Sequence, residues 1–146
     1  MDYLDFLIEG RVPGILFHAS PTQGLKFLDA KETKSTHLKV NKPYIYATDE
    51  VSYAAGFSFD WGNNEGFRFG SEDYGKPWEL QVPRKHAHRL KAPCSIYTLR
   101  GAGFKKVYGQ DTPEFYKTGR VKLDKEIKYK TALECLKTNN VIVTFI

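Results

Sequence analysis

Hydrophobic and polar positions alternate along much of the chain, and this pattern predicts several short strands and few helices. Half-buried strands show such a period of two and are rich in β-branched and aromatic residues. The stretches that fit are Ile15 to Phe17, Tyr44 to Tyr46, Trp78 to Val82, Ser95 to Leu99, Phe104 to Tyr108 and Val141 to Ile146. Because the predicted helices are brief, we expect an α+β fold.

A short helix is predicted near each end of the chain. The first covers Tyr3 to Ile8 and is ended by Gly10. The second covers Ala132 to Lys137, where Thr131 and Glu134 have the spacing of a capping box. Gly10 therefore marks the end of the first predicted helix, and Thr131 marks the start of the second.

The segment from Asp60 to Lys76 is rich in glycine and lacks a hydrophobic period. We predict a long flexible loop there, which could close as a lid over a ligand. A second polar loop is expected from about Lys31 to His37, ahead of the strand that contains Tyr46.

The chain has 146 residues, which suits one domain over residues 1–146. No stretch approaches the roughly 20 apolar residues of a membrane span. The acidic residues Asp2 and Asp5 are unlike the start of a signal peptide. Cys94 and Cys135 are far apart, with no Cys or His nearby at metal-ligand spacing. We therefore expect a monomeric cytoplasmic protein without a metal site.

The formal net charge of +5 predicts an anionic partner, such as a dinucleotide pyrophosphate, a nucleic acid or an acidic protein. The densest basic run is Arg84 to Lys91, and more basic residues lie between Lys117 and Lys137. Neither has the interleaved aromatic residues that stack on bases, so solvated surfaces are the simpler interpretation. His86 and His88 lack a third metal ligand, and we interpret them as a solvent-facing pair.

Two motifs carry the strongest functional information. Phe17-His18-Ala19-Ser20 ends one strand, and Tyr44-Ile45-Tyr46-Ala47-Thr48-Asp49 ends another that leads to Ala54-Ala55-Gly56-Phe57. This arrangement resembles the ADP-ribosyltransferases, most closely the branch of diphtheria toxin and the poly(ADP-ribose) polymerases. The resemblance implies the split, mostly antiparallel β-sheet with short helices of that family.

Tyr46 and Phe57 lie 11 residues apart, which is the separation of the two stacking aromatic residues in that branch. A short helix opened by Thr48 or Asp49 would turn the two rings towards one point. Facing rings form a slot for a flat ligand, and they attract the cationic nicotinamide ring of NAD by about 0.5–2 kcal/mol per contact. The small residues from Ala54 to Gly56 would leave room beside the ligand.

The resemblance assigns roles to the first motif as well. His18 would hydrogen-bond a ribose hydroxyl, and Ala19 would hold the nicotinamide carboxamide through its main-chain N–H and C=O groups. Ser20 would offer a hydroxyl nearby. The chain has Ala19 where many members have Gly, and Phe57 where many have Tyr. Neither change removes stacking, but Phe57 cannot donate a hydrogen bond.

The family also has a carboxylate on a later strand, which stabilises the oxocarbenium-like ribose as the bond to nicotinamide breaks. Glu114, which precedes Phe115, resembles the Glu-aromatic start of that motif. Glu79, between apolar neighbours, and Glu126, interpreted as a surface residue, are the rivals. Arginine-directed transferases carry a second Glu or Gln where this chain has Thr112, which disfavours arginine as the acceptor.

We therefore predict a mono-ADP-ribosyltransferase that uses NAD as co-substrate and an unidentified acceptor macromolecule, either protein or nucleic acid. His18 would hold ribose, Tyr46 and Phe57 would sandwich nicotinamide, and Glu114 would stabilise the oxocarbenium. Three alternatives stay open. They are a non-catalytic module of the same fold that binds NAD or ADP-ribose, a basic nucleic-acid-binding domain, and, last, an RNA 2′-phosphotransferase, whose basic catalytic residues we cannot place here.

Overall fold

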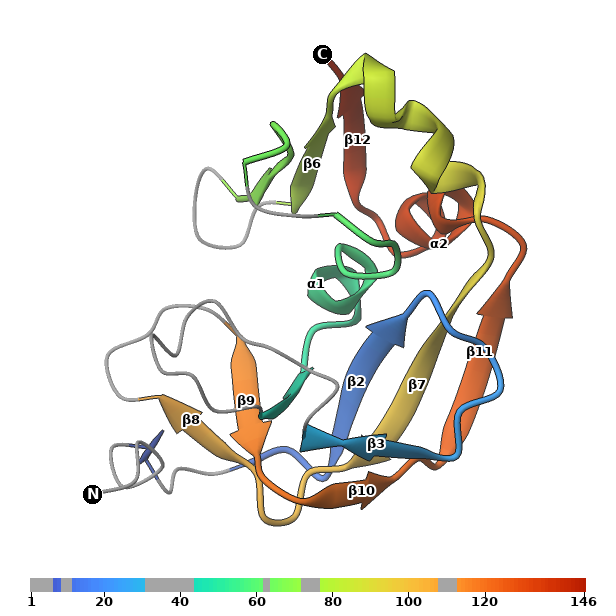
Figure 1. Ribbon diagram of the computed structural model, residues 1–146. Coiled ribbons are helices and arrows are strands. Elements are labelled where there is room, and N and C mark those ends of the chain that lie inside the picture. Colours follow the sequence, from blue (N-terminus) through green and yellow to red (C-terminus); the bar gives the residue numbers. More distant parts are fainter. Residues whose placement is uncertain (1–6, 9–11, 31–43, 62–63, 72–76, 108–112) are drawn as a thin grey trace. The chain divides into compact units, whose positions relative to one another are not determined.

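The computed structural model describes residues 7–8, 12–30, 44–61, 64–71, 77–107 and 113–146 (Figure 1). The chain divides into two compact units. The first comprises residues 1–18, 25–50 and 98–125, and the second comprises residues 19–24, 51–97 and 126–146. Strands dominate, most of their pairings are antiparallel and the helices are short, which is an α+β architecture as predicted.

The first unit contains most of one sheet and a separate two-stranded ribbon. The sheet strands follow one another in the order β1 (Leu7–Ile8), β8 (Lys105–Val107), β9 (Glu114–Lys117), β4 (Ile45–Thr48) and β2 (Ile15–Ser20). Each of these strands is antiparallel to the next. The ribbon pairs β3 (Phe27–Asp29) with β10 (Arg120–Lys122), as Figure 1 shows.

The hydrophobic pattern of the central strands explains why this sheet forms. Leu16 of β2 and Ile45 and Ala47 of β4 are completely buried, and so is Tyr44 just before β4. Full burial of a leucine or isoleucine side chain contributes about 1.5–3 kcal/mol, so these positions fix β2 and β4 in the interior of the unit.

The second unit contains a mixed three-stranded sheet, in which β6 (Glu79–Val82) is the central strand. It is antiparallel to β5 (Arg68–Gly70) and parallel to β12 (Ile142–Phe145). The last residues of β2 also belong to this unit, where they continue the order β2, β7 (Cys94–Arg100) and β11 (Lys125–Tyr129).

The second unit contains three short helices. They are α1 (Val51–Ala55), the 3₁₀ helix η3 (Arg84–Lys91) and α2 (Ala132–Thr138). The role of Thr131 as the N-cap of α2 is confirmed, because its side chain accepts a hydrogen bond of 3.0 Å from the Glu134 backbone N–H. None of the described helices has the length and apolar character needed to cross a membrane.

Two predictions about local structure are wrong where the structure describes the chain. Leu7 and Ile8 form strand β1 and pair with β8, although a helix was predicted over Tyr3 to Ile8; residues 3–6 lie outside the described residues. Part of the predicted loop over 60–76 is strand β5, held by pairing with β6, whereas residues 62–63 and 72–76 lie outside the description. In both places pairing with a distant strand overrides the local pattern.

Candidate functional site

The first unit places Tyr46, Thr48, Glu114 and Tyr116 on one face of its sheet. Strands β4 and β9 are antiparallel, with Tyr46 opposite Tyr116 and Thr48 opposite Glu114. Residues directly opposite each other, and residues two apart on one strand, point to the same side of a sheet. A carboxylate and two phenol rings therefore share this face.

His18 lies on the neighbouring strand β2 and contacts Tyr46. The two ring centroids are 5.0 Å apart, and His18 Nδ1 is 2.8 Å from the backbone carbonyl oxygen of Tyr46. Because a carbonyl only accepts hydrogen bonds, Nδ1 carries the hydrogen and donates it. In the neutral ring Nε2 then has a lone pair, so it can accept a hydrogen bond from a ligand hydroxyl.

Burial keeps this histidine neutral. His18 is only 4% exposed. Desolvation lowers its pKa from 6.5 to about 4, and the hydrogen bond to Tyr46 opposes this effect only in part. At neutral pH the ring therefore offers an acceptor and no positive charge.

Glu114 is also buried, with 4% exposure, and lies on β9. The Tyr116 hydroxyl donates a hydrogen bond to its Oε2. Burial raises the pKa of the Tyr46 phenol, and the negative charge of Glu114 raises it further. The carboxylate is thus close enough to Tyr46 for its charge to act on that side chain.

Tyr46 on β4 therefore contacts the hydrogen-bond acceptor His18 of β2 and shares a sheet face with the buried Glu114 carboxylate of β9. An aromatic face attracts a flat cationic ring, and a carboxylate held near it stabilises positive charge that develops on an attached sugar. These are the groups that the sequence motifs assigned to His18, Tyr46 and Glu114.

No protein-family model, curated protein or solved structure matches this chain. The functional argument therefore depends on the chemistry and geometry of these residues.

Phe57 and Ala54 lie in the second unit. The Phe57 ring packs at 5.2 Å from Tyr53, 5.9 Å from Trp61 and 5.7 Å from Phe69, measured between ring centroids. Ala54 is buried within α1.

The sequence predicted open space for a ligand beside the small residues from Ala54 to Gly56, but at Gly56 the Phe69 ring fills that space. A Cβ atom added there would lie 2.3 Å from the Phe69 ring. The glycine therefore permits close packing of that ring, and the space next to it is not open to a ligand.

Ala19 and Ser20 are the last residues of β2, and both are buried. The Ser20 Oγ accepts a hydrogen bond of 3.0 Å from the Thr22 backbone N–H. This bond uses only a lone pair of the hydroxyl, so Ser20 can still donate its hydrogen.

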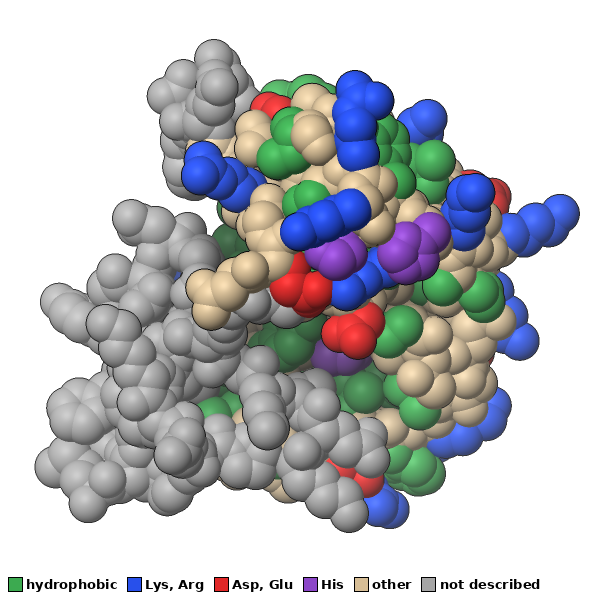
Figure 2. Space-filling model, turned by 45° about the horizontal axis from the view of Figure 1, so that its top comes forward, with side chains coloured by type: hydrophobic (Ala, Val, Ile, Leu, Met, Phe, Trp, Pro, Cys, Tyr) green, Lys and Arg blue, Asp and Glu red, His purple; other side chains and the backbone are tan. Residues whose placement is uncertain are grey.

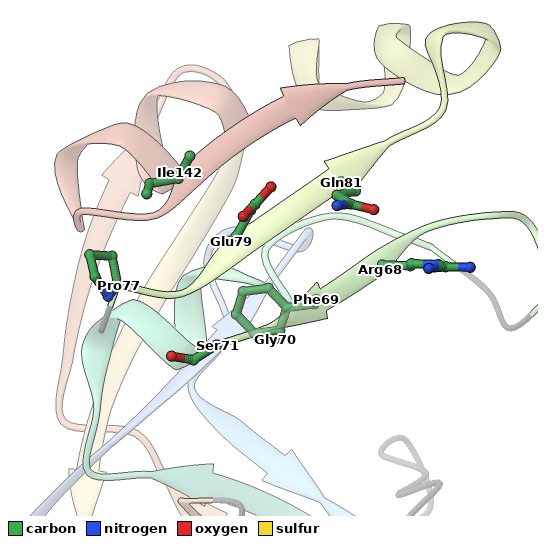
Figure 3. Close-up of a pocket in the computed structure, with 8 residues that line it drawn as sticks. All are labelled: Arg68, Phe69, Gly70, Ser71, Pro77, Glu79, Gln81 and Ile142. Carbon is green, nitrogen blue, oxygen red and sulfur yellow. The ribbon is translucent and has the colours of Figure 1, made fainter. Parts of the chain in front are cut away.

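Glu79, the first rival carboxylate, lies in the second unit on the central strand β6. It lines an open groove of 410 Å³ together with Gln81 and Ile142, and the Thr144 hydroxyl donates to its Oε1 at 3.3 Å. In Figure 3, Arg68, the positively charged residue of the groove, extends away from Glu79.

Glu126, the second rival, is not the simple surface residue that the sequence indicated. Its Oε2 accepts hydrogen bonds from the Gly24 backbone N–H at 2.9 Å, the Ser95 hydroxyl at 2.6 Å and the Tyr97 hydroxyl at 3.1 Å. These donors, with that of Ser95 foremost, lower the pKa of Glu126. The Glu126 carboxylate thus links the turn after β2 to strand β7 by hydrogen bonds, which is a structural role.

Two residues on the face of Glu114 were missed in the sequence. Tyr116 is two residues from Glu114 on the same strand, so the alternation of β9 could have identified it. Lys105 lies opposite Tyr116 in the pairing of β8 with β9 and therefore shares this face. Nothing local to Lys105 indicates that register.

The basic run from Arg84 to Lys91 forms η3 rather than a loop or strand face. His86 stacks on Phe67 at 5.5 Å and its Nε2 is 3.7 Å from Glu65, so only His88 is solvent-facing as predicted. Basic side chains are scattered over the visible described surface in Figure 2, among neutral and hydrophobic ones.

Cys94 and Cys135 are buried free thiols. Among the residues that the structure describes, no three His, Cys, Asp or Glu side chains are grouped to hold a metal ion.

Proposed function

We propose that this protein is a mono-ADP-ribosyltransferase with an ADP-ribosyltransferase-like fold, which uses NAD as co-substrate and transfers ADP-ribose to an acceptor macromolecule. The observation that carries the proposal is that the Tyr46 ring contacts His18 of β2 and shares one sheet face with Glu114 of β9. Three separate parts of the sequence supply these residues, and each has the side chain that the chemistry needs.

In the proposed complex, nicotinamide stacks on the Tyr46 ring, and Nε2 of neutral His18 accepts a hydrogen bond from a hydroxyl of the attached ribose. The pKa of His18, about 4, keeps this acceptor available at neutral pH. The raised pKa of Tyr46 keeps its phenol protonated, so the stacking ring stays uncharged.

The bond between the ribose carbon and the nicotinamide nitrogen breaks first, and its electron pair leaves with nicotinamide. The ribose becomes oxocarbenium-like, and the Glu114 carboxylate stabilises this positive charge. An acceptor nucleophile then attacks the ribose carbon and loses its proton. Water takes the place of the acceptor in a slow side reaction that hydrolyses NAD.

Charge stabilisation of this kind contributes on the order of 100-fold to 1,000-fold in rate. We therefore expect Glu114→Gln to lower nicotinamide release from NAD by at least about 100-fold, and Tyr46→Ala to reduce it strongly through loss of stacking. Glu126→Gln is the matched control, because that carboxylate also accepts a hydrogen bond from a tyrosine hydroxyl but lies in the second unit.

The experiment measures nicotinamide release and transfer of labelled ADP-ribose in cell lysate, which supplies acceptors. Loss of both in Glu114→Gln, with Glu126→Gln still active, supports the transferase. Stabilisation of the wild type against heat by NAD without release points instead to a binding module. Salt-sensitive binding of oligonucleotides that NAD does not affect points to a nucleic-acid-binding domain.

A further inference from the structure

Tyr116 has an environment that a packing role alone does not require. The residue is only 1% exposed and lies opposite Tyr46 in the pairing of β9 with β4. Its hydroxyl donates a hydrogen bond to Oε2 of Glu114. A buried tyrosine usually satisfies its hydroxyl, but here the acceptor is the carboxylate of the candidate site.

The chemistry of a buried carboxylate gives this hydrogen bond its importance. A carboxylate with little access to water needs a donor to stabilise its charge, and a hydrogen bond to the ionised form favours that form. The bond also restricts rotation of the carboxylate about its terminal torsion, which is otherwise broad.

We propose that Tyr116 is a positioning residue that holds the Glu114 carboxylate in one orientation for the ribose of NAD. The inference rests on the proposed function. Tyr116 acts through Glu114 and does not touch the reacting atoms. Its hydroxyl therefore affects the chemical step more than the binding of NAD.

Tyr116→Phe tests this role, because it removes the hydroxyl and keeps the buried ring. Tyr97→Phe is a closely matched control. Tyr97 is fully buried, and its hydroxyl also hydrogen-bonds a carboxylate, Oε2 of Glu126, at 3.1 Å. The two variants lose the same chemical group, but only one of them loses a bond to Glu114.

We expect Tyr116→Phe to lower kcat for nicotinamide release by about tenfold, or about 1.4 kcal/mol. The KM for NAD should change less than twofold, because Tyr116 does not contact NAD. Tyr97→Phe should leave kcat and KM unchanged.

A double-mutant cycle separates action through Glu114 from general damage. In a Glu114→Gln background, single-turnover measurements should show less than a twofold further effect of Tyr116→Phe, because the charge that Tyr116 serves is already absent. A full tenfold effect in that background overturns the positioning role.

The remaining outcomes distinguish this proposal from the proposed function. An active wild type in which Tyr116→Phe and Tyr97→Phe behave alike overturns the role of Tyr116 and leaves the transferase standing. A wild type that neither releases nicotinamide nor transfers ADP-ribose, while it remains folded, overturns both.

Discussion

The buried His18 makes a direct prediction about stability at low pH. Its folded-state pKa is about 4, lowered by burial from the ordinary value of 6.5. Between these two values the unfolded chain binds a proton that the folded protein excludes. The free energy of unfolding must therefore fall as the pH decreases from 6.5 towards 4 and rise as the pH increases through that range.

The size of this effect follows from the two pKa values. A difference of 2.5 between them corresponds to a limit of about 3.4 kcal/mol at 1.36 kcal/mol for each pKa unit. At pH 5 the histidine contribution is already about 2 kcal/mol smaller than at pH 7. Such a loss is large beside the 5–15 kcal/mol of a typical domain.

The test compares wild type with His18→Asn, because asparagine does not titrate and can still donate to the Tyr46 carbonyl. Urea unfolding at pH 7 and pH 5 gives the free energy of unfolding for each protein. Far-ultraviolet circular dichroism is the suitable probe, since Trp61 and Trp78 both lie in the second unit, whereas His18 lies in the first. His88→Asn, at an exposed position, is the control.

The wild type should lose about 2 kcal/mol more than His18→Asn between pH 7 and pH 5, because other acid-sensitive groups contribute equally to both. His88→Asn should follow the wild type. Equal losses in wild type and His18→Asn would refute the reasoning, as would an NMR titration of the His18 ring with its midpoint near 6.5.

Two further predictions concern packing and capping. Gly56→Ala should destabilise the protein by about 1–3 kcal/mol, because the new Cβ would lie 2.3 Å from the Phe69 ring; Gly70→Ala, where no heavy atom lies within 4 Å, should cost much less in the same urea assay. Thr131→Ala should cost about 1 kcal/mol, because it removes the acceptor for the Glu134 N–H, while Thr131→Ser should retain most of the stability; equal stability of the two variants contradicts a capping role.

The sequence was sufficient for elements whose pattern is local. The strand predicted over Ser95 to Leu99 is observed as Cys94–Arg100, and the helix predicted over Ala132 to Lys137 is observed as Ala132–Thr138. Alternation and a capping box are properties of a short window, so no knowledge of distant partners was needed.

Elements that form only by pairing with a strand distant in the sequence could not be predicted from local patterns. The apolar run that contains Leu7 and Ile8 is compatible with a helix until β8 is available to pair with it. Glu126 has lysines as sequence neighbours, but its donors include Gly24 and Ser95, which no local pattern brings near it. The neighbouring lysines therefore suggested a surface role for Glu126, whereas in the folded chain its carboxylate accepts hydrogen bonds from these donors.

The candidate site shows the same division. The family resemblance singled out His18, Tyr46 and Glu114; Tyr116 was missed, although the alternation of β9 places it on the side of Glu114. The presence of Lys105 on the same face follows only from the register of β8 against β9. The sequence was thus sufficient to propose individual site residues, whereas the full set of residues around the Glu114 carboxylate could be identified only from the strand pairing in the sheet.

The burial of His18 affects stability and the proposed chemistry in different pH ranges. At pH 5, protonation of the unfolded chain has already lowered the free energy of unfolding. About 90% of folded molecules still have a neutral His18 ring at this pH, because the folded-state pKa is about 4. Nε2 thus remains an acceptor for ribose throughout the range in which stability declines. A fall in nicotinamide release per folded molecule between pH 7 and pH 5 must then come from a group other than His18.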